Sequence, residues 1–345
     1  MAKLFFLLSG ENETLPSAEL RAVLEAEEYS FTPTESLDQV LRLDTNSKSV
    51  DIIMQRAAYT RVTALELFCC EATDETIAKA AESVDFKKTL NQGEGFAVRI
   101  HRVREYSVKA DTMKLERTLG NHILRNSANS KVNLRTPSKT FIGILTSGKL
   151  VFGVKLAEAK IKTFSERRPR RKPFFHPSAM PSKLARCMVN LAHARSGSLV
   201  LDPFCGTGST LIEAALIGCR VLGSDAQRRM IVGCRKNLKH FSVTAEGLIM
   251  AVARDLPLKA VDCVVTDPPY GRSASTLRST TQALVEEAAS SAKVLLKKGQ
   301  RICIASPKTL NISQIGEQLG YQHVESHFAY VHRTLTREIA VFEKM

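Results

Sequence analysis

Four consecutive residues, Asp267, Pro268, Pro269 and Tyr270, are suited to act on an exocyclic amino group of a nucleic-acid base. Such an amino group is a poor nucleophile because its lone pair is delocalised into the ring. The carboxylate of Asp267 and the backbone carbonyl of Pro268 can accept its two N–H bonds and aim the lone pair at an electrophile. The prolines hold the turn rigid, and Tyr270 offers a ring on which the base can stack. This pattern predicts a catalytic loop; the alternative is a structural Pro-Pro turn.

An earlier turn that contains two glycines has the properties of a cofactor loop. Gly206 and Gly208 allow the backbone to approach a ligand closely, and Asp202 stands at the end of the preceding apolar run, where open α/β sheets bind ligands. The next apolar run ends at Asp225, an acid suited to hydrogen-bond both hydroxyls of a ribose. Together these residues predict a nucleoside-bearing cofactor. The alternatives are a tight helix entry or a pyrophosphate loop at the glycines, and a helix N-cap at Asp225.

Strands that alternate with helices from Pro181 onward would position these loops. We expect strands over 198–201, 220–223, 263–266 and 301–305. We expect helices that begin at Ser209, Gln227, Thr281 and Ile312. This alternation predicts an α/β fold with a parallel sheet covered on both faces. Residues 327–330 and 338–342 are expected to add an antiparallel hairpin at the sheet edge.

The first half of the chain has a different character, that of a small α+β region. Its β-type runs cover 3–8, 39–43, 96–102, 139–145 and 150–156. Its clearest amphipathic helices cover 17–28 and 109–125.

The net charge of +14 over 345 residues favours a polyanionic partner, because Lys and Arg release condensed counterions when they neutralise phosphates. Between the two halves, a run of cations faces only Glu158 and Glu166, which predicts phosphate contacts; the alternative is a solvated linker. The cations that we expect to bind RNA are Lys162, Arg167, Arg168, Arg170, Arg171 and Lys172 in this connector, with Arg99, Arg102 and Arg104 in the first half.

The cysteines and the N-terminus predict a soluble protein of the cytoplasm. The eight cysteines have no metal-ligand spacing, so we expect reduced thiols and no metal site. The only apolar N-terminal stretch, residues 4–8, is too short for a signal peptide or a membrane span. We therefore expect no membrane partner.

The second half, from about Phe174 to the end, resembles the class I amino-methyltransferases. The resemblance rests on Asp-Pro-Phe-Cys-Gly-Thr-Gly at 202–208, which is similar to their cofactor loop, and on Asp-Pro-Pro-Tyr-Gly at 267–271, which is similar to their catalytic loop. It implies a Rossmann-like, doubly wound seven-stranded sheet and S-adenosylmethionine as the methyl donor.

The first half resembles a THUMP domain, an RNA-binding module. The matching features are residues 96–102, the helix that reaches Leu119-Gly120, and residues 131–134 before Pro137. With the tail 331–337, the whole chain is similar to the archaeal and eukaryotic tRNA guanosine-10 N2-methyltransferases. The domains expected are an α+β, ferredoxin-like region (1–50), a THUMP domain (51–156), a basic linker (157–180) and a methyltransferase domain (181–345).

This resemblance implies direct in-line methylation of the N2 amino group of a tRNA guanosine, at position 10, once or twice. The residues it assigns to the cofactor are His176, Pro177, Pro181, Asp202, Phe204, Cys205, Gly206, Thr207, Gly208, Asp225 and Ala253. Relatives carry Gly-Asp-Ala where this chain has 251–253, so Val252 replaces an acid that accepts a hydrogen bond from adenine. A small zinc-binding activating subunit is a further partner that the resemblance implies.

Three other functions compete with this one. A DNA adenine or cytosine amino-methyltransferase shares the catalytic loop but needs a base-reading region for which the residues after Tyr270 leave little room. A tRNA guanine-N2 methyltransferase could act at another position. An RNA-binding protein with a lapsed methyltransferase domain is the non-enzymatic alternative, and Val252 is its only support. Cys205 is not expected to be a nucleophile, because amino nitrogen needs no covalent activation.

Overall fold

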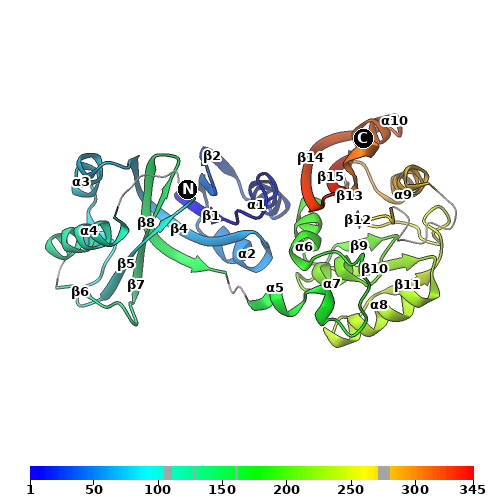
Figure 1. Cartoon of the computed structure of the whole chain (residues 1–345), viewed down its shortest axis with the longest axis horizontal. Helices are drawn as coiled ribbons and strands as arrows, with labels where there is room; N and C mark the ends of the chain where they lie inside the picture. Colours follow the sequence, from blue (N-terminus) through cyan, green and yellow to red (C-terminus); the bar gives the residue numbers. More distant parts are fainter. Residues whose placement is uncertain (105–110, 128, 160–161, 271–279) are drawn as a thin grey trace. The chain divides into compact units, whose positions relative to one another are not determined.

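A computed structural model of the chain describes all residues except 105–110, 128, 160–161 and 271–279. It divides into two compact units (Figure 1). The first unit contains Met1–Glu13, Tyr29–Met54 and Thr60–Ala159. The second unit contains Thr14–Glu28, Gln55–Tyr59 and Lys160–Met345. Two short segments from early in the chain therefore belong to the second unit.

The first unit is built on one eight-stranded sheet of order β2-β3-β1-β4-β8-β7-β5-β6. Its strands are β1 (Ala2–Leu8), β2 (Phe31–Leu37), β3 (Val40–Thr45), β4 (Thr60–Glu71), β5 (Gly95–Arg102), β6 (Lys131–Val132), β7 (Lys139–Thr146) and β8 (Lys149–Glu158). Because β4 pairs with both β1 and β8, residues expected to form two regions share one sheet. The strand β4 and the short β2 and β6 were not expected from the sequence.

Helix α4 (Thr112–Asn126) makes the crossover that the parallel pair β5 and β7 requires. Its first turn is capped by the Asp111 carboxylate, which accepts from the backbone N–H groups of Met113 and Lys114. Leu115, Leu119 and Ile123 form its buried face. The expected helix is thus present, although residues 109 and 110 lie outside the described residues. The other helical segments here are α2 (Ser49–Arg56), α3 (Asp74–Glu82) and the 3-10 turn η1 (Phe86–Lys88).

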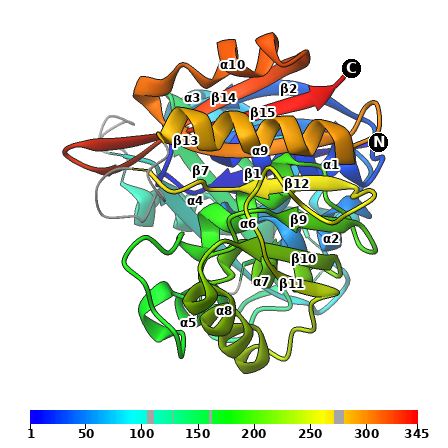
Figure 2. The same ribbon diagram turned by 90° about the vertical axis from the view of Figure 1, so that its right-hand side faces the viewer.

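The second unit contains a seven-stranded sheet of order β11-β10-β9-β12-β13-β15-β14, which runs from bottom to top in Figure 2. Its strands are β9 (Leu199–Asp202), β10 (Arg220–Asp225), β11 (Gly247–Met250), β12 (Cys263–Thr266), β13 (Arg301–Pro307), β14 (Tyr321–His332) and β15 (Leu335–Lys344). The first five are parallel, and β15 is antiparallel to β13. The expected seven-stranded sheet with an antiparallel hairpin at its edge is confirmed.

Helices cover both faces of this sheet, as parallel strands require. On one face, α9 (Thr281–Leu295) and α10 (Ile312–Gln318) pack over an apolar cluster that includes Val264 and Ile302. On the other, the helices are α1 (Leu15–Ala26), α6 (Ser182–Leu191), α7 (Ser209–Ala215) and α8 (Arg228–His240). The connector forms α5 (Lys162–Glu166) and the 3-10 turn η2 (Pro169–Arg171), and a third 3-10 turn, η3 (Lys308–Leu310), follows β13. No helix among the described residues is long and apolar enough to cross a membrane.

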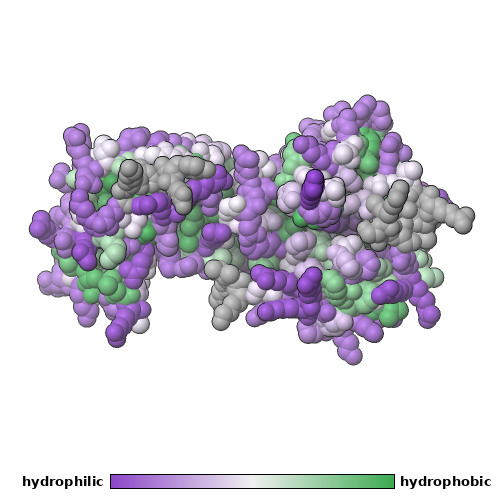
Figure 3. Space-filling model, in the orientation of Figure 1, coloured by the Kyte–Doolittle hydropathy of each residue, from purple (hydrophilic) through white to green (hydrophobic). Residues whose placement is uncertain are grey.

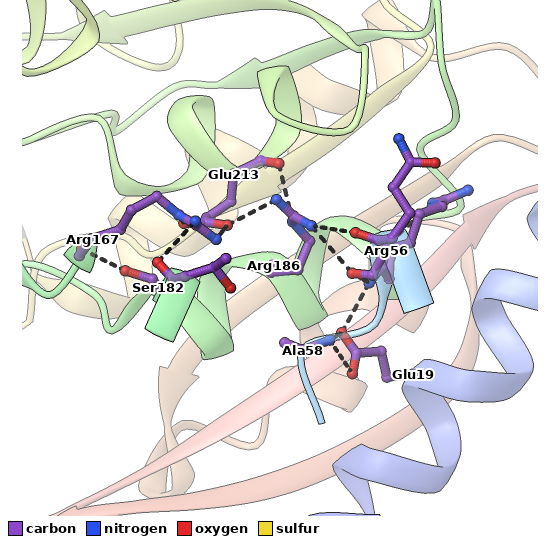
Figure 4. Close-up of polar contacts among 10 residues, drawn as sticks. Glu19, Arg56, Ala58, Arg167, Ser182, Arg186 and Glu213 are labelled. Carbon is purple, nitrogen blue, oxygen red and sulfur yellow. Dashed lines mark hydrogen bonds and ion pairs between the residues drawn. The ribbon is translucent and has the colours of Figure 1, made fainter. Parts of the chain in front are cut away.

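A buried polar network joins α1 and the segment around Arg56 to α6 and α7 (Figure 4). The Glu19 carboxylate, fully buried, accepts hydrogen bonds from the backbone N–H groups of Ala58 and Tyr59 and from the side-chain amide of Asn190. Arg186 donates to the carbonyl of Arg56 and forms an ion pair with Glu213 at 3.0 Å. Buried polar groups are tolerated only when they are paired, so this network fixes α1 and the Arg56 segment to α6 within the second unit.

Replacing Glu19 by Ala should lower the free energy of unfolding by about 3–5 kcal/mol, because three buried donors lose their acceptor. Chemical denaturation at pH 8 measures this with the carboxylate ionised, since burial raises the pKa of Glu19 to about 7. Glu25→Ala on the same helix is the control. It removes an exposed pair with His193 and should cost less than about 1 kcal/mol. Equal losses would show that the network contributes no specific stability.

Candidate functional site

The carboxyl ends of β9, β10 and β12 surround a cavity of about 740 Å³, which is within the range of small-molecule sites. All four residues of the expected catalytic loop, 267–270, line it. The expected cofactor residues that line it are His176, Pro177, Phe204, Gly206, Asp225 and Ala253. The structure therefore brings the two loops, sixty residues apart in the sequence, to one cavity.

The turn after β9 follows a path that demands glycine. Gly206 and Gly208 have φ values of +48° and +80°, which lie in the left-handed region. A Cβ atom on Gly208 would also lie 2.7 Å from the sulfur of Cys234. At Gly206 the nearest atom would be 3.8 Å away, so this glycine leaves room at the cavity for a ligand.

Asp202 lies beneath this turn and does not line the cavity. Its carboxylate accepts hydrogen bonds from the backbone N–H of Phe204 at 3.1 Å and from the hydroxyl of Thr266 at 2.8 Å. Burial raises the pKa of Asp202 to about 7. Asp202 thus braces the cofactor loop against the end of β12. Four other expected cofactor residues also lie outside the cavity lining: Pro181, Cys205, Thr207 and Gly208.

Asp225 stands at the end of β10 with its carboxylate at the cavity. Its two oxygens accept from the backbone N–H groups of Gly206 at 3.1 Å and Gln227 at 2.9 Å. The bond to Gln227 is a turn interaction that precedes α8, whose N-cap is Gln227 itself, so Asp225 is not the helix N-cap of the alternative. Because each carboxylate oxygen has two lone pairs, Asp225 retains capacity for the hydroxyls of a ligand. Burial raises the pKa of Asp225 above its ordinary value.

The expected catalytic loop is held by Arg337, to which no role was assigned from the sequence. Asp267 accepts from the Tyr270 hydroxyl at 2.8 Å through one oxygen and pairs with Arg337 at 3.0 Å through the other. Arg337 also donates to the Tyr270 oxygen through Nε, and its guanidinium lies 5.5 Å from the centre of the Tyr270 ring. Burial raises the pKa of Asp267, and the charge of Arg337 limits that rise. Gly271, the last residue of the motif, lies outside the described residues.

Arg337 was missed because its position depends on β15, whose first residues return to the cavity. The register sets Arg337 opposite Pro307, at the carboxyl end of β13. Arg337 ends the tail 331–337 that carries part of the resemblance, but no role was assigned to it, because an arginine just before an apolar strand is ordinarily an exposed strand end.

The expected RNA-binding residues are divided between the units and differ in exposure. In the first unit, Arg99 donates to the carbonyl of Leu134, Arg104 pairs with Asp38 at 3.2 Å, and Arg102 is exposed.

In the connector, only some of the cations have free access to solvent. Arg168, Arg170 and Arg171 are exposed, and Figure 3 shows hydrophilic side chains gathered over α5 and the residues that follow it. Arg167 instead forms a two-point contact with the buried carboxylate of Glu213, at 2.7 and 3.1 Å. Lys162 begins α5.

Lys172 is buried and donates to the Ser209 hydroxyl at 2.7 Å, at the start of α7. Burial lowers the pKa of Lys172 to about 8. Lys172 and Arg167 therefore already have partners within the second unit, in contrast to the three exposed arginines.

Comparison with known proteins agrees with this geometry. Residues 169–338 match the RMKL-like methyltransferase domain, and residues 71–151 match the THUMP domain. The chain is 40% identical, over 99% of its length and 100% of the other, to a tRNA (guanine(10)-N2)-dimethyltransferase of Methanothermobacter thermautotrophicus. This chain belongs to that family. The protein of the same name from Methanocaldococcus jannaschii is 28% identical, with 99% of both chains covered.

Solved structures support the fold. TrmN from Thermus thermophilus is similar over 99% of this chain and 100% of its own, with a TM-score of 0.54 and 18% identity. SMU.472, whose structure was solved as a complex with SAH, is similar over 100% of this chain and 99% of its own, with a TM-score of 0.53 and 15% identity. The expected methyltransferase fold and THUMP domain are confirmed.

Val252, where an acid was expected from the resemblance, lines the cavity between Ala251 and Ala253. Val252→Asp should therefore tighten binding of S-adenosylmethionine by about 1–2 kcal/mol, because the new carboxylate can accept from the adenine amino group. Parallel calorimetric titrations of the wild type and the variant measure this. Val252→Asn, which offers a neutral acceptor, should give a smaller gain. Unchanged or weaker binding in a folded Val252→Asp variant would mean that other groups hold adenine.

Proposed function

We propose that this chain transfers methyl groups from S-adenosylmethionine to the N2 amino group of the guanosine at position 10 of tRNA. One observation carries the proposal: the Asp267 carboxylate, an acceptor for an amino group, lines the same cavity as Gly206 and Asp225. The enzyme class follows from membership of the methyltransferase family, and the tRNA guanosine is the substrate that the relatives' names state.

The residues at the cavity fit S-adenosylmethionine. The carboxylate of Asp225 suits the ribose hydroxyls, and the turn at Gly206 leaves backbone accessible to the methionine portion. Ala253 suits the adenine, to which it offers its backbone N–H. Asp202 supports this loop through Phe204 and does not contact the ligand directly. When bound, the cofactor supplies an electrophilic methyl group on a sulfonium.

The catalytic loop prepares the amino nitrogen for direct attack. Asp267 and the carbonyl of Pro268 accept its N–H bonds, which localises the lone pair on nitrogen, and Tyr270 stacks on the base. The N2–C bond forms as the C–S bond breaks, S-adenosylhomocysteine leaves, and the nitrogen gives one proton to the Asp267 carboxylate, from which it passes to solvent. Preorganised acceptors and orientation supply the rate enhancement.

Nucleoside mass spectrometry tests the proposal. Purified enzyme, S-adenosylmethionine and an unmodified tRNA transcript should yield N2-methylguanosine or N2,N2-dimethylguanosine, and a transcript with adenosine at position 10 should yield neither. Duplex DNA should not be methylated, which separates this function from the DNA amino-methyltransferase alternative. Activity of the chain alone also decides whether the small zinc-binding activating subunit is required.

Asp267→Ala should lower single-turnover methylation by at least about a hundredfold, because it removes an acceptor that orients the amino group. Calorimetry should find nearly unchanged cofactor affinity. Asp262→Ala is the control: this exposed acid, which accepts from the backbone N–H of Leu199, precedes the same strand at its other end and should leave turnover near normal. Near-normal turnover in Asp267→Ala would falsify the role assigned to the loop.

We propose that the exposed arginines of the connector contact tRNA phosphates and that exposed cations on α8 add to the same contacts. Asn237 of α8 donates to the carbonyl of Phe174 and accepts from its N–H, so the connector packs on this helix. The exposed cations of α8 are Arg228, Arg229, Arg235, Lys236 and Lys239, and none forms an ion pair with a described acid. Arg220 on β10 is also exposed but, in contrast, pairs with Glu246 at 2.8 Å.

Replacing Arg168, Arg170 and Arg171 together by Ala should weaken tRNA binding and reduce the log–log salt slope by about 2–3, one contact per arginine. Fluorescence titrations at several salt concentrations measure both. Arg220→Ala removes an exposed but paired arginine and should leave the slope unchanged. If the triple variant keeps the wild-type slope, the connector is a solvated linker.

A further inference from the structure

Arg337 does more at the cavity than its contacts with the catalytic loop require. It is 7% exposed, yet it belongs to the cavity lining together with Asp267 and Tyr270. Its Nε and Nη2 atoms bind Tyr270 and Asp267, whereas its Nη1 makes no hydrogen bond with a described residue. A guanidinium has five N–H donors in a fixed plane, so donors remain for a ligand.

A counter-charge for Asp267 alone would not need this geometry. A lysine ammonium provides the same charge as a compact point, whereas arginine adds a planar fork that recognises paired acceptors. At this site the fork sets a row of donors directly beside a carboxylate acceptor, with the two groups 3.0 Å apart. In this row the two oxygens of Asp267 accept and the guanidinium of Arg337 donates, so a matching ligand edge must present two donors followed by an acceptor.

The Watson–Crick edge of guanine has that pattern: the N2 amino group and N1–H donate, and O6 accepts. Adenine lacks this pattern, because its amino group is followed along the edge by N1, which is an acceptor. Resting on the proposed function, we propose that Arg337 is a specificity-determining residue that donates to O6 of the target guanine while Asp267 accepts from its amino group. The N2 amino group replaces the Tyr270 hydroxyl at one oxygen of Asp267, and the other oxygen, which Arg337 already contacts, accepts from N1–H through its second lone pair.

This arrangement also gives a reason for excluding adenine. An adenine whose amino group bonds to Asp267 sets its N1, an acceptor, against the second carboxylate oxygen, which is also an acceptor, and unpaired buried polar groups discriminate strongly between substrates. Arg337 fixes that second oxygen and supplies the donor for O6, so the choice of guanine depends on a residue outside the loop.

A single-atom change in the substrate tests the proposal. A tRNA assembled by ligation carries 6-thioguanosine at the target position, which keeps N1–H and the N2 amino group but replaces O6 by sulfur, a weaker acceptor. In single-turnover assays with excess enzyme, wild type should methylate guanosine about tenfold or more faster than 6-thioguanosine. In Arg337→Met this ratio should fall to about one to two, although both rates decrease.

Arg301→Met is the matched control. Arg301 lies at the other end of β13, where it pairs with Glu343 at 3.2 Å, and its loss should leave the ratio at the wild-type value. Arg337→Lys keeps a counter-charge for Asp267, so it should methylate faster than Arg337→Met and show a reduced ratio. A wild-type ratio near one, or a wild-type ratio that persists in either Arg337 variant, would overturn the proposal. Absence of guanosine N2 methylation by wild type would instead overturn the proposed function.

Discussion

The carboxylate of Asp267 is largely buried at the end of β12, and a buried charge is unfavourable unless a counter-charge and hydrogen bonds accompany it. Arg337 and Tyr270 provide both. Because β12 and β13 are parallel, their carboxyl ends meet at one edge of the sheet, and only an antiparallel strand brings its first residues to that edge. The antiparallel direction of β15 therefore places the counter-charge that the buried carboxylate of Asp267 requires. The cofactor loop depends on the same strand end, since Asp202 reaches Thr266.

The parts of the fold that the sequence predicts are those with a strong local pattern. Strands such as Cys263–Thr266 are continuous apolar runs, and α4 has a capping acid and an apolar face. The central strand β4 was missed because Glu66 interrupts its apolar pattern. The Glu66 carboxylate is buried on a face of the sheet, where it pairs with Arg42 from another strand. The edge strand β11 has four residues, all at least partly exposed, so burial imposes no pattern on it.

The same distinction applies to the site. Residues adjacent to strand ends, such as Asp225 and Asp267, could be predicted because a strand and its following turn are contiguous in the sequence. Side chains whose partners are remote could not. From the neighbouring sequence alone, Arg167 and Lys172 look like unpaired cations. In the structure they bind Glu213 and Ser209, which lie 46 and 37 residues further along the chain. Asp202 was expected to contact the ligand. Its hydrogen bonds, one of them to the remote Thr266, show that it instead supports the loop.

The network that holds α1 gives the chain an interleaved construction. Glu19 and Arg56 precede most of the first unit in the sequence, yet they belong to the second unit. Their partners Asn190 and Ala194 lie there as well. A gene cut at any single point between the units separates these partners, so a fragment that begins after residue 159 would lack α1 and the Arg56 segment, which pack on the face of α6 that carries Arg186 and Asn190. Recombination that replaces one half of the chain would therefore destabilise the second unit. We therefore expect the two halves to be inherited as one chain, as they are in the two archaeal relatives that this chain matches over their full length.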